Sequence, residues 1–339
     1  MENGLLIGRP MLPNSRLPYL IVPPATVPAD LLEFGRAHRA RLSDLLQKQG
    51  ALLLRGFGAS SQTFGAFVDV VCGSRLNYSY RSTPRTTVSE KVFTSTIYPA
   101  NREILLHSEC AYQEAWPLYL AFCCVLTARR GGETPLADLL RVSDRIGPEL
   151  MAEFRQRGVR YIRNYRYGVD IPWTEVFQTQ DRAEVQDYCN ARDIQYEWLP
   201  DDGLRTAQTC QGTAVHPYLR CEIWFNQAHL FHVSSVGTEV ERFLIQTYGA
   251  RSVPRNAFYG DGSEIGRDEL TRIRNAFEAE SVTFPWMNGD VLLVDNMQVA
   301  HGRRPYIGDR SILVAMSTEY SSVGRQVPRY EPVPDTAAR

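Results

Sequence analysis

The sequence predicts a mainly β fold with helical insertions, of the β-sandwich or jelly-roll kind. Short apolar runs rich in β-branched and aromatic residues gather in the first third of the chain and return after residue 280. Between them, over about 140–280, most of the recognisable patterns have helical spacing. Strands and helices therefore do not alternate regularly along the chain, and a βαβ fold with a parallel sheet is not expected.

Length and composition are those of an ordinary globular protein. The chain has 339 residues, of which 44% are hydrophobic and 22% charged, and these values exclude collagen-like, low-complexity and largely disordered chains. We expect one domain over 1–339, with a core over about 50–320 and a helix-rich insert over about 140–280. The net charge of −1 does not indicate a nucleic-acid or membrane partner.

Targeting segments and disulfides are not expected either. The longest apolar run, 118–126, is much shorter than the ~20 residues of a membrane span. Prolines interrupt the N-terminal segment in which a signal peptide would need an apolar stretch. The seven cysteines are odd in number and form no CxxC pair, so we interpret them as reduced thiols of a cytoplasmic protein.

The first half of the chain combines two expected helices with several strands. Proline-rich and polar residues make 1–29, and the last dozen residues, extended or frayed. The spacing of the leucines predicts a helix over 30–48, with Asp30 as its N-cap and Gly50 as its end. The remaining expected elements are a strand at 51–57, a helix at 62–72, a strand at 92–98 within a polar loop over 76–101, and a strand at 118–126.

The second half begins with helices and ends with strands. A helix is expected over 143–157, capped by Ser143 and ended by Gly158. Similar spacing predicts helices over 181–192, 238–249 and 264–279. The chain then returns to apolar runs, which predict strands at 281–286, 290–295 and 311–317.

Two histidines and one glutamate stand where a metal site could form. His107 and Glu109 are two residues apart, and on a strand such residues point to the same face. A single His-x-acid triplet is common by chance, but here it lies in an apolar context, and His301 follows another apolar run. Two imidazoles and one carboxylate form the facial triad of non-haem Fe(II) oxygenases, which leaves three metal positions open. Arg310, farther along, has the forked guanidinium that binds a dicarboxylate bidentately.

In these motifs the sequence resembles the taurine dioxygenase (TauD/TfdA) family, within the clavaminate-synthase-like group of Fe(II)/2-oxoglutarate oxygenases. The resemblance extends from about Leu52 to Ser317 and rests on H-x-E at 107–109, GGETPLAD at 131–138, GDVLLVDN at 289–296, and the later histidine and arginine. It implies a double-stranded β-helix, or jelly roll, and the use of Fe(II), 2-oxoglutarate and O₂. The matching positions are His107, Glu109 and His301 as metal ligands and catalytic residues, with Thr134 and Arg310 binding 2-oxoglutarate.

Details of the resemblance bear on the substrate. Glu109 replaces the aspartate of taurine dioxygenase and is typical of members that act on amino acids. Val314 stands where the family often has a second arginine, so a small sulfonate substrate is not expected. The segments at 160–168, 172–181 and 223–232 look like the syringomycin-type amino-acid hydroxylase branch found in nonribosomal peptide and antibiotic pathways.

This branch resemblance implies hydroxylation of an unactivated carbon of an amino acid or amino-acid-derived substrate, with release of succinate and CO₂. The substrate would be free or tethered to an acyl or peptidyl carrier protein. Two alternatives stay open. The same cofactor chemistry can give desaturation, epimerisation or cyclisation, and a cupin-like fold can serve as a non-catalytic metal-binding or docking module. The intact set of ligand and arginine positions argues against the second alternative.

Other polar residues are candidates for substrate binding. Arg81 and Arg85 lie in the loop before the His-x-Glu motif and could hold a substrate carboxylate. Glu103 could meet a substrate ammonium group, and Asn226 could line the substrate cavity. Of the remaining histidines, we expect His229 and His232 to pack in the interior and His216 and His38 to be exposed.

Overall fold

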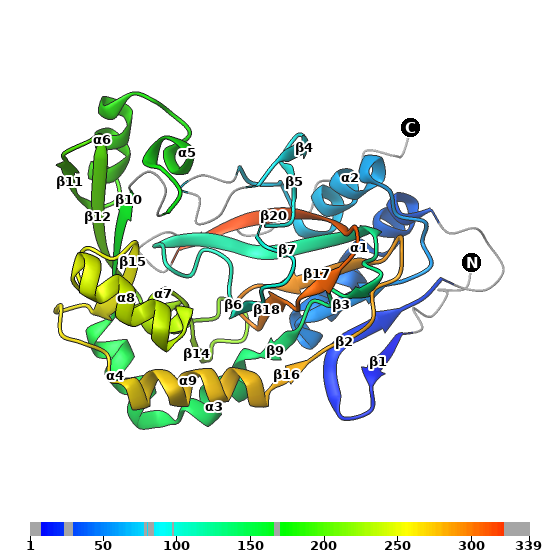
Figure 1. The fold of residues 1–339 in the computed structure, drawn as a ribbon. Helices are drawn as coiled ribbons and strands as arrows, with labels where there is room; N and C mark the ends of the chain where they lie inside the picture. Colours follow the sequence, from blue (N-terminus) through cyan, green and yellow to red (C-terminus); the bar gives the residue numbers. More distant parts are fainter. Residues whose placement is uncertain are drawn as a thin grey trace.

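The computed structural model describes residues 8–23, 30–77, 80, 85–96, 98–165 and 170–321, and in this part the chain is mainly β with helices (Figure 1). An eight-stranded sheet forms its centre, with strand order β1-β2-β3-β17-β7-β20-β5-β4. Its pairs are antiparallel except β2 with β3, which is parallel. The strands are β1 (Gly8–Leu12), β2 (Ser15–Ile21), β3 (Ala51–Leu54), β17 (Val291–Asp295), β7 (Ala115–Leu126), β20 (Ser311–Ser321), β5 (Val92–Thr94) and β4 (Thr87–Ser89).

A second, smaller sheet carries two of the candidate metal ligands, His107 and His301. It has the order β16-β9-β18-β6, and His301 of β18 lies directly opposite His107 of β6 in the register. The ring of His301 lies 5.2 Å, between centroids, from that of Phe122 in β7, so the two sheets meet at this point. The strands are β16 (Ser281–Val282), β9 (Leu136–Asp138), β18 (Val299–Arg303) and β6 (Ile104–His107), beside the short pair β8 (Arg130–Gly131) and β19 (Tyr306–Ile307).

Two capped helices pack beside the large sheet. In α1 (Leu31–Gln49) the carboxylate of Asp30 accepts the N–H of Glu33, and Gly50 ends the helix with a φ of 79°, as predicted. In α2 (Ser61–Cys72), Ser60 and Thr63 form a capping box. The apolar sides of both helices join β3, β7, β17 and β20 in one hydrophobic core.

The prediction of one helix over 143–157 is wrong in where the helix starts and in its continuity. The structure has two helices here, α3 (Leu139–Ile146) and α4 (Pro148–Arg157), separated by Gly147. Asp138, and not Ser143, caps α3, because its carboxylate accepts the N–H of Leu140. Gly147 has a φ of 83°, which interrupts the helix, and Pro148 starts the next one at its favoured first position.

The insert is also less helical than predicted, since it contains a four-stranded antiparallel sheet of order β11-β12-β10-β15. Its strands, with a separate pair β13 and β14, are β10 (Val159–Tyr165), β11 (Gln195–Leu199), β12 (Gly203–Cys210), β13 (Thr213–Val215), β14 (Glu222–Trp224) and β15 (Arg255–Tyr259). Around them lie α5 (Trp173–Phe177), α6 (Arg182–Asn190), α7 (Ala228–Phe231), a 3-10 turn (Val233–Val236), α8 (Thr238–Tyr248) and α9 (Arg267–Ala279). A second hydrophobic core joins α3, α4, α9 and the inner face of this sheet.

The N-terminal segment is more ordered than the sequence predicts, whereas the cysteines are as predicted. Residues 8–21, expected to be extended or frayed, form two strands of the large sheet, so the core begins well before residue 50. All seven cysteines are free thiols, as predicted. Within the described ranges, no helix combines the length and apolar character that crossing a membrane requires.

Candidate metal and co-substrate site

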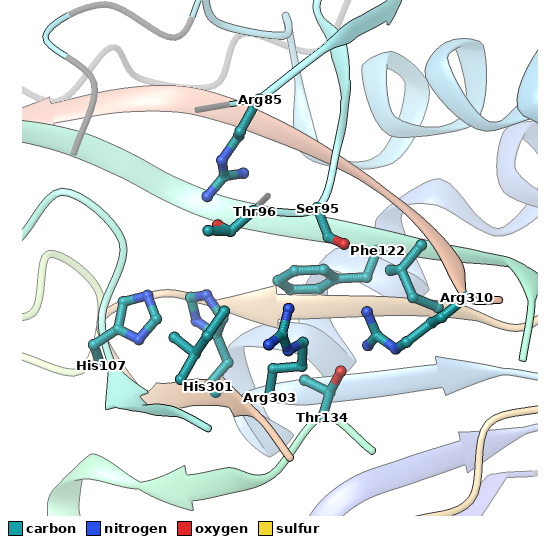
Figure 2. Close-up of a pocket in the computed structure, with 12 residues that line it drawn as sticks. Arg85, Ser95, Thr96, His107, Phe122, Thr134, His301, Arg303 and Arg310 are labelled. Atoms are coloured by element: carbon teal, nitrogen blue, oxygen red, sulfur yellow. The ribbon is translucent and has the colours of Figure 1, made fainter. Parts of the chain in front are cut away.

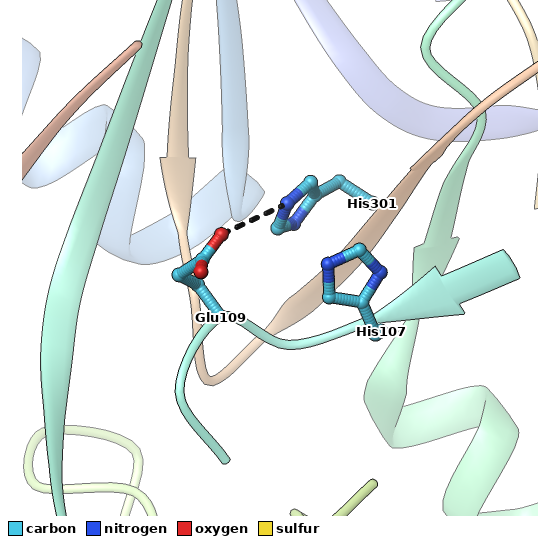
Figure 3. Close-up of side chains that lie close together, drawn as sticks. All are labelled: His107, Glu109 and His301. Carbon is cyan, nitrogen blue, oxygen red and sulfur yellow. Dashed lines mark ion pairs between the residues drawn. The ribbon is translucent and has the colours of Figure 1, made fainter. Parts of the chain in front are cut away.

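His107, Glu109 and His301 come together at one end of the small sheet (Figure 3). Each offers one ligand atom, and these atoms lie within 4.8 Å of one another. His107 ends β6 and His301 is its partner on β18, so backbone pairing sets the two rings 4.6 Å apart between centroids. Nε2 of His301 lies 3.8 Å from Oε2 of Glu109. The structure therefore assembles the three predicted ligands from positions almost 200 residues apart in sequence.

The sequence pattern suggested that Glu109 lies on the same strand as His107, and the structure shows that it does not. β6 ends at His107, and a turn follows in which Cys110 has a left-handed φ of 58°. Buried amide side chains hold this turn. Asn296 accepts the N–H of Glu109 through Oδ1 (2.7 Å) and donates from Nδ2 to the Glu109 carbonyl (3.0 Å), while Gln227 donates to the Ser108 carbonyl (2.6 Å). The carboxylate thus owes its position to tertiary hydrogen bonds rather than to strand geometry.

Burial keeps both histidines in the form that binds a metal. Desolvation lowers the pKa of His107 and lowers that of His301 well below its usual value, so the imidazoles are neutral at pH 7. Nδ1 of His107 lies 2.7 Å from the Leu105 carbonyl, and a neutral ring that donates there leaves the lone pair of Nε2 available.

The donor set fits a divalent iron ion. Nδ1 of His301 is buried and, within the described part of the chain, has no hydrogen-bond partner. Its Nε2 lies too far from Glu109 for a hydrogen bond. A buried imidazole whose nitrogens make no hydrogen bond is unusual, unless a ligand such as a metal ion binds to one of them. Two neutral imidazoles and one carboxylate match the ligands that Fe(II) takes in facial-triad sites.

A cavity next to the histidines is lined mainly by polar and cationic side chains (Figure 2). Arg310 and Thr134 lie at the end away from His107. Arg310 is anchored by Nε, which donates to the Gly132 carbonyl at 2.9 Å. Burial and the nearby Arg303 lower the pKa of Arg310 to about 10, so it is still a cation at neutral pH. The lining residues are Arg85, Ser95, Thr96, Ile104, His107, Phe122, Thr134, His301, Gly302, Arg303, Arg310 and Ile312.

Trp286, which the sequence analysis did not single out, controls the orientation of the Thr134 hydroxyl. Its indole Nε1–H, which can only donate, lies 3.1 Å from Thr134 Oγ1. The threonine oxygen is therefore the acceptor, and its own O–H is left to donate to a ligand in the cavity. Trp286 is held in turn by an edge contact with Phe284, at 4.9 Å between ring centroids.

Replacing Trp286 by phenylalanine should raise the dissociation constant of 2-oxoglutarate about 3- to 10-fold, because one hydrogen bond that orients Thr134 is lost while ring packing is retained. Titration of the metal-loaded protein with 2-oxoglutarate measures this. Trp198→Phe makes the same change on the insert sheet, at β11, and should leave the constant unaltered. Equal constants for wild type and Trp286→Phe would show that the tryptophan does not orient the threonine.

Arg303 is a second residue that the sequence analysis missed. It is buried, and its guanidinium donates to the carbonyls of Tyr98 (3.0 Å), Pro99 (2.6 Å) and Arg102 (2.8 Å). These carbonyls belong to the segment that leads into β6. Arg303 therefore braces the approach to His107 as well as lining the cavity, and its place two residues after His301 was the available signal.

The four predicted substrate contacts have different surroundings. Arg85 lines the cavity and pairs with Glu109. Arg81 lies outside the described residues. Glu103 does not line the cavity, because its carboxylate pairs with Arg304, and Asn226 is used internally, donating to the Gly212 carbonyl and accepting the N–H of Ala228. Of the three that the structure describes, only Arg85 lies at the candidate metal site.

The prediction for His216 is wrong. Its side chain is fully buried, and Nε2 lies 2.9 Å from Oδ2 of Asp295, while its Nδ1 accepts the N–H groups of Tyr218 and Leu219. This contact ties the insert to the end of β17, next to Asn296. His229 is packed inside as predicted, with Nε2 2.9 Å from the Leu106 carbonyl, and burial lowers its pKa to about 4.

Comparison with known proteins gives matches over almost the whole chain. The family described as taurine catabolism dioxygenase TauD, TfdA family, matches residues 17–316. The dapdiamide synthesis protein DdaC of Enterobacter agglomerans is 42% identical over 297 residues, covering 87% of this chain and 90% of DdaC. A clavaminate synthase-like protein of Arabidopsis thaliana is 29% identical over 318 residues, covering 88% and 93%.

Solved structures agree in fold. A crystal structure of a taurine dioxygenase from Burkholderia xenovorans superposes with a TM-score of 0.53 at 14% identity, covering 94% of this chain and 92% of that one. At this level of identity the match concerns the arrangement of the elements alone.

Proposed function

Because the chain belongs to the TauD/TfdA family of dioxygenases, which use Fe(II), 2-oxoglutarate and O₂, we propose that it oxidises an unactivated carbon of an amino-acid-derived substrate. The assembled triad of His107, Glu109 and His301 carries the proposal. The expected reaction is hydroxylation, with release of succinate and CO₂. The two sheets that meet at His301 and Phe122 would be the halves of the jelly roll that the sequence resemblance implies.

The roles of the side chains follow from their places. His107, Glu109 and His301 would hold the iron, which with 2-oxoglutarate and O₂ supplies the oxidising power. Arg310, anchored on Gly132, would bind the distal carboxylate of 2-oxoglutarate, and the Thr134 hydroxyl would donate to the same group. Phe122 and Ile312 add apolar surface to the lining, which limits the access of water during the reaction.

The substrate class rests on the relatives. DdaC is named for dapdiamide synthesis, and its 42% identity over 87% of this chain supports an amino-acid-derived substrate in natural-product biosynthesis. A carrier-protein tether belongs to the proposal as well, on the branch resemblance of the insert segments. Arg85, as a cation in the cavity lining, is the expected partner of an anionic group of the substrate.

The proposal can be tested without knowing the substrate. Apo protein receives Fe(II) and then 2-oxoglutarate without oxygen, and chelation should produce a weak visible charge-transfer band at one equivalent. His301→Ala should abolish the band, because it removes a metal ligand, whereas His38→Ala, on α1, should leave it intact. Succinate release on admission of O₂ gives an independent readout. Stoichiometric iron binding with neither band nor succinate would contradict the assignment and favour a non-catalytic metal-binding module.

A further inference from the structure

A buried ion pair stands beside the metal ligands. Nη2 of Arg85 lies 2.7 Å from Oε2 of Glu109, and the two side chains are only 5% and 4% exposed. Arg85 lies just before β4, and Figure 2 shows its guanidinium reaching into the region of the cavity that His107 and His301 border. A cation and a metal ligand thus share one desolvated space.

The pair matters most when no metal is bound. A buried carboxylate is strongly destabilising unless a cation or several hydrogen bonds compensate its charge. The nearest imidazole does not do this, because Nε2 of His301 lies 3.8 Å from Oε2 of Glu109, beyond hydrogen-bond distance. Among the described residues, Arg85 gives the Glu109 carboxylate its one charge-assisted hydrogen bond. Its charge therefore compensates Glu109 where the metal would otherwise have to do so.

In the metal-bound state the same cation has the opposite effect. A divalent ion bound to Glu109 must lie within a few ångströms of the guanidinium, and like charges at such distances repel appreciably in a buried site. Arg85 should therefore weaken metal binding while it stabilises the metal-free protein. Both effects follow from one contact, and they predict opposite responses of the apo and the metal-bound protein to the loss of Arg85.

We propose that Arg85 is a positioning residue: it acts as the built-in counter-ion of Glu109, keeping the ligand turn in its binding geometry before the metal arrives and lowering the affinity for that metal. This inference rests on the proposed function for the presence of a metal. It does not require a substrate, so it is separate from any contact that Arg85 makes with one.

Thermal unfolding in EDTA and in saturating Mn(II) tests the inference. In EDTA, Arg85→Gln should lower the Tm by roughly 4–7 °C, since it leaves a buried carboxylate without its cation. Mn(II) should then raise the Tm of this variant by more than it raises that of the wild type. The dissociation constant for Mn(II) should be about 3- to 10-fold lower, because a larger gain in Tm requires tighter binding to the folded state. Arg85→Lys keeps the charge and should behave closer to the wild type.

A double-mutant cycle in EDTA isolates the pair. Arg85→Gln should cost little when Glu109 is already glutamine, because no buried charge is left to compensate. Arg55→Gln is the matched control: Arg55 forms a 2.7 Å pair with the buried Asp290, away from the metal ligands. This control should lower the Tm equally with and without Mn(II).

Three results would overturn the inference. The first is an equal loss of Tm in EDTA and Mn(II) for Arg85→Gln, as in the control. The second is an unchanged or weakened Mn(II) affinity of this variant. The third is an absence of coupling in the cycle. A wild type whose Tm does not respond to Mn(II) would instead contradict the proposed function, and the EDTA cycle would still report whether Arg85 and Glu109 depend on each other. The two failures are therefore distinguishable.

Discussion

Arg310→Ala should raise the dissociation constant of 2-oxoglutarate by about 100- to 1000-fold while leaving Fe(II) binding intact. Arg310 is a half-buried cation in the cavity lining, anchored through Nε so that its terminal amino groups can meet a carboxylate. Removing one partner of a hydrogen-bonded charge pair that the bound ligand buries typically costs 2–5 kcal/mol, or about 30- to 5000-fold, and the expected increase lies within this span. Anaerobic titration of the charge-transfer band measures the constant directly.

Two further variants make this result specific. Arg310→Lys keeps the charge but loses the fork, so we expect an intermediate increase of about 10- to 100-fold. Arg304→Ala removes a neighbouring arginine that pairs with Glu103 outside the cavity, and it should leave the constant unchanged. If Arg310→Ala bound 2-oxoglutarate as tightly as the wild type, the distal carboxylate would have to lie elsewhere, with Arg303 as the nearest other cation at that end.

Helices and strands could be predicted where their apolar spacing and their end residues lie within one short segment of the sequence. The helix over 30–48 has its leucine spacing, its Asp30 cap and its Gly50 end all within one short segment, and the structure reproduces each. The apolar runs that became β3, β7, β17 and β20 are long or regular enough to be recognised alone. Local sequence patterns do not predict an element whose structure depends on contacts with distant segments. One example is β2, which becomes a strand by pairing in parallel with β3.

The insert shows the same limit. β10 contains Arg163 and Asn164, polar residues that break an apolar pattern, yet both are buried between β12 and β15. Asn164 is compensated by the Val253 carbonyl, 89 residues away, which no local pattern reveals. His216 was assigned to the surface for a similar reason, since its partner Asp295 is 79 residues distant.

At the site, the candidate ligands of the metal and of 2-oxoglutarate were recognisable in the sequence because their types and order are characteristic. The residues that hold them in place were not. Asn296, Trp286 and Arg303 act through hydrogen bonds to atoms more than 150 residues away in sequence. Asparagine and arginine are common on protein surfaces and tryptophan is common in interiors, so only the fold shows that these three residues are part of the site.

Asn296→Asp should have the largest effect of any change to these supporting residues. The buried amide accepts the N–H of Glu109 and donates to the carbonyls of Glu109 and Pro117, at 3.0 and 2.8 Å. Aspartate has the same shape and keeps the acceptor, but it replaces the donor by a second oxygen facing two carbonyls. If ionised it also places a negative charge in the interior without a cation.

We therefore expect Asn296→Asp to lower the Tm by roughly 4–8 °C and the Mn(II) affinity by about 10- to 100-fold, the usual range for residues that orient a metal ligand. Asn288→Asp provides the matched control, because Asn288 is exposed and only accepts the N–H of Thr127, a role that aspartate retains. A fall in Tm with unchanged Mn(II) affinity would mean that Asn296 stabilises the fold without positioning Glu109. Loss of affinity in the folded variant would instead show that the ligand turn depends on this one amide.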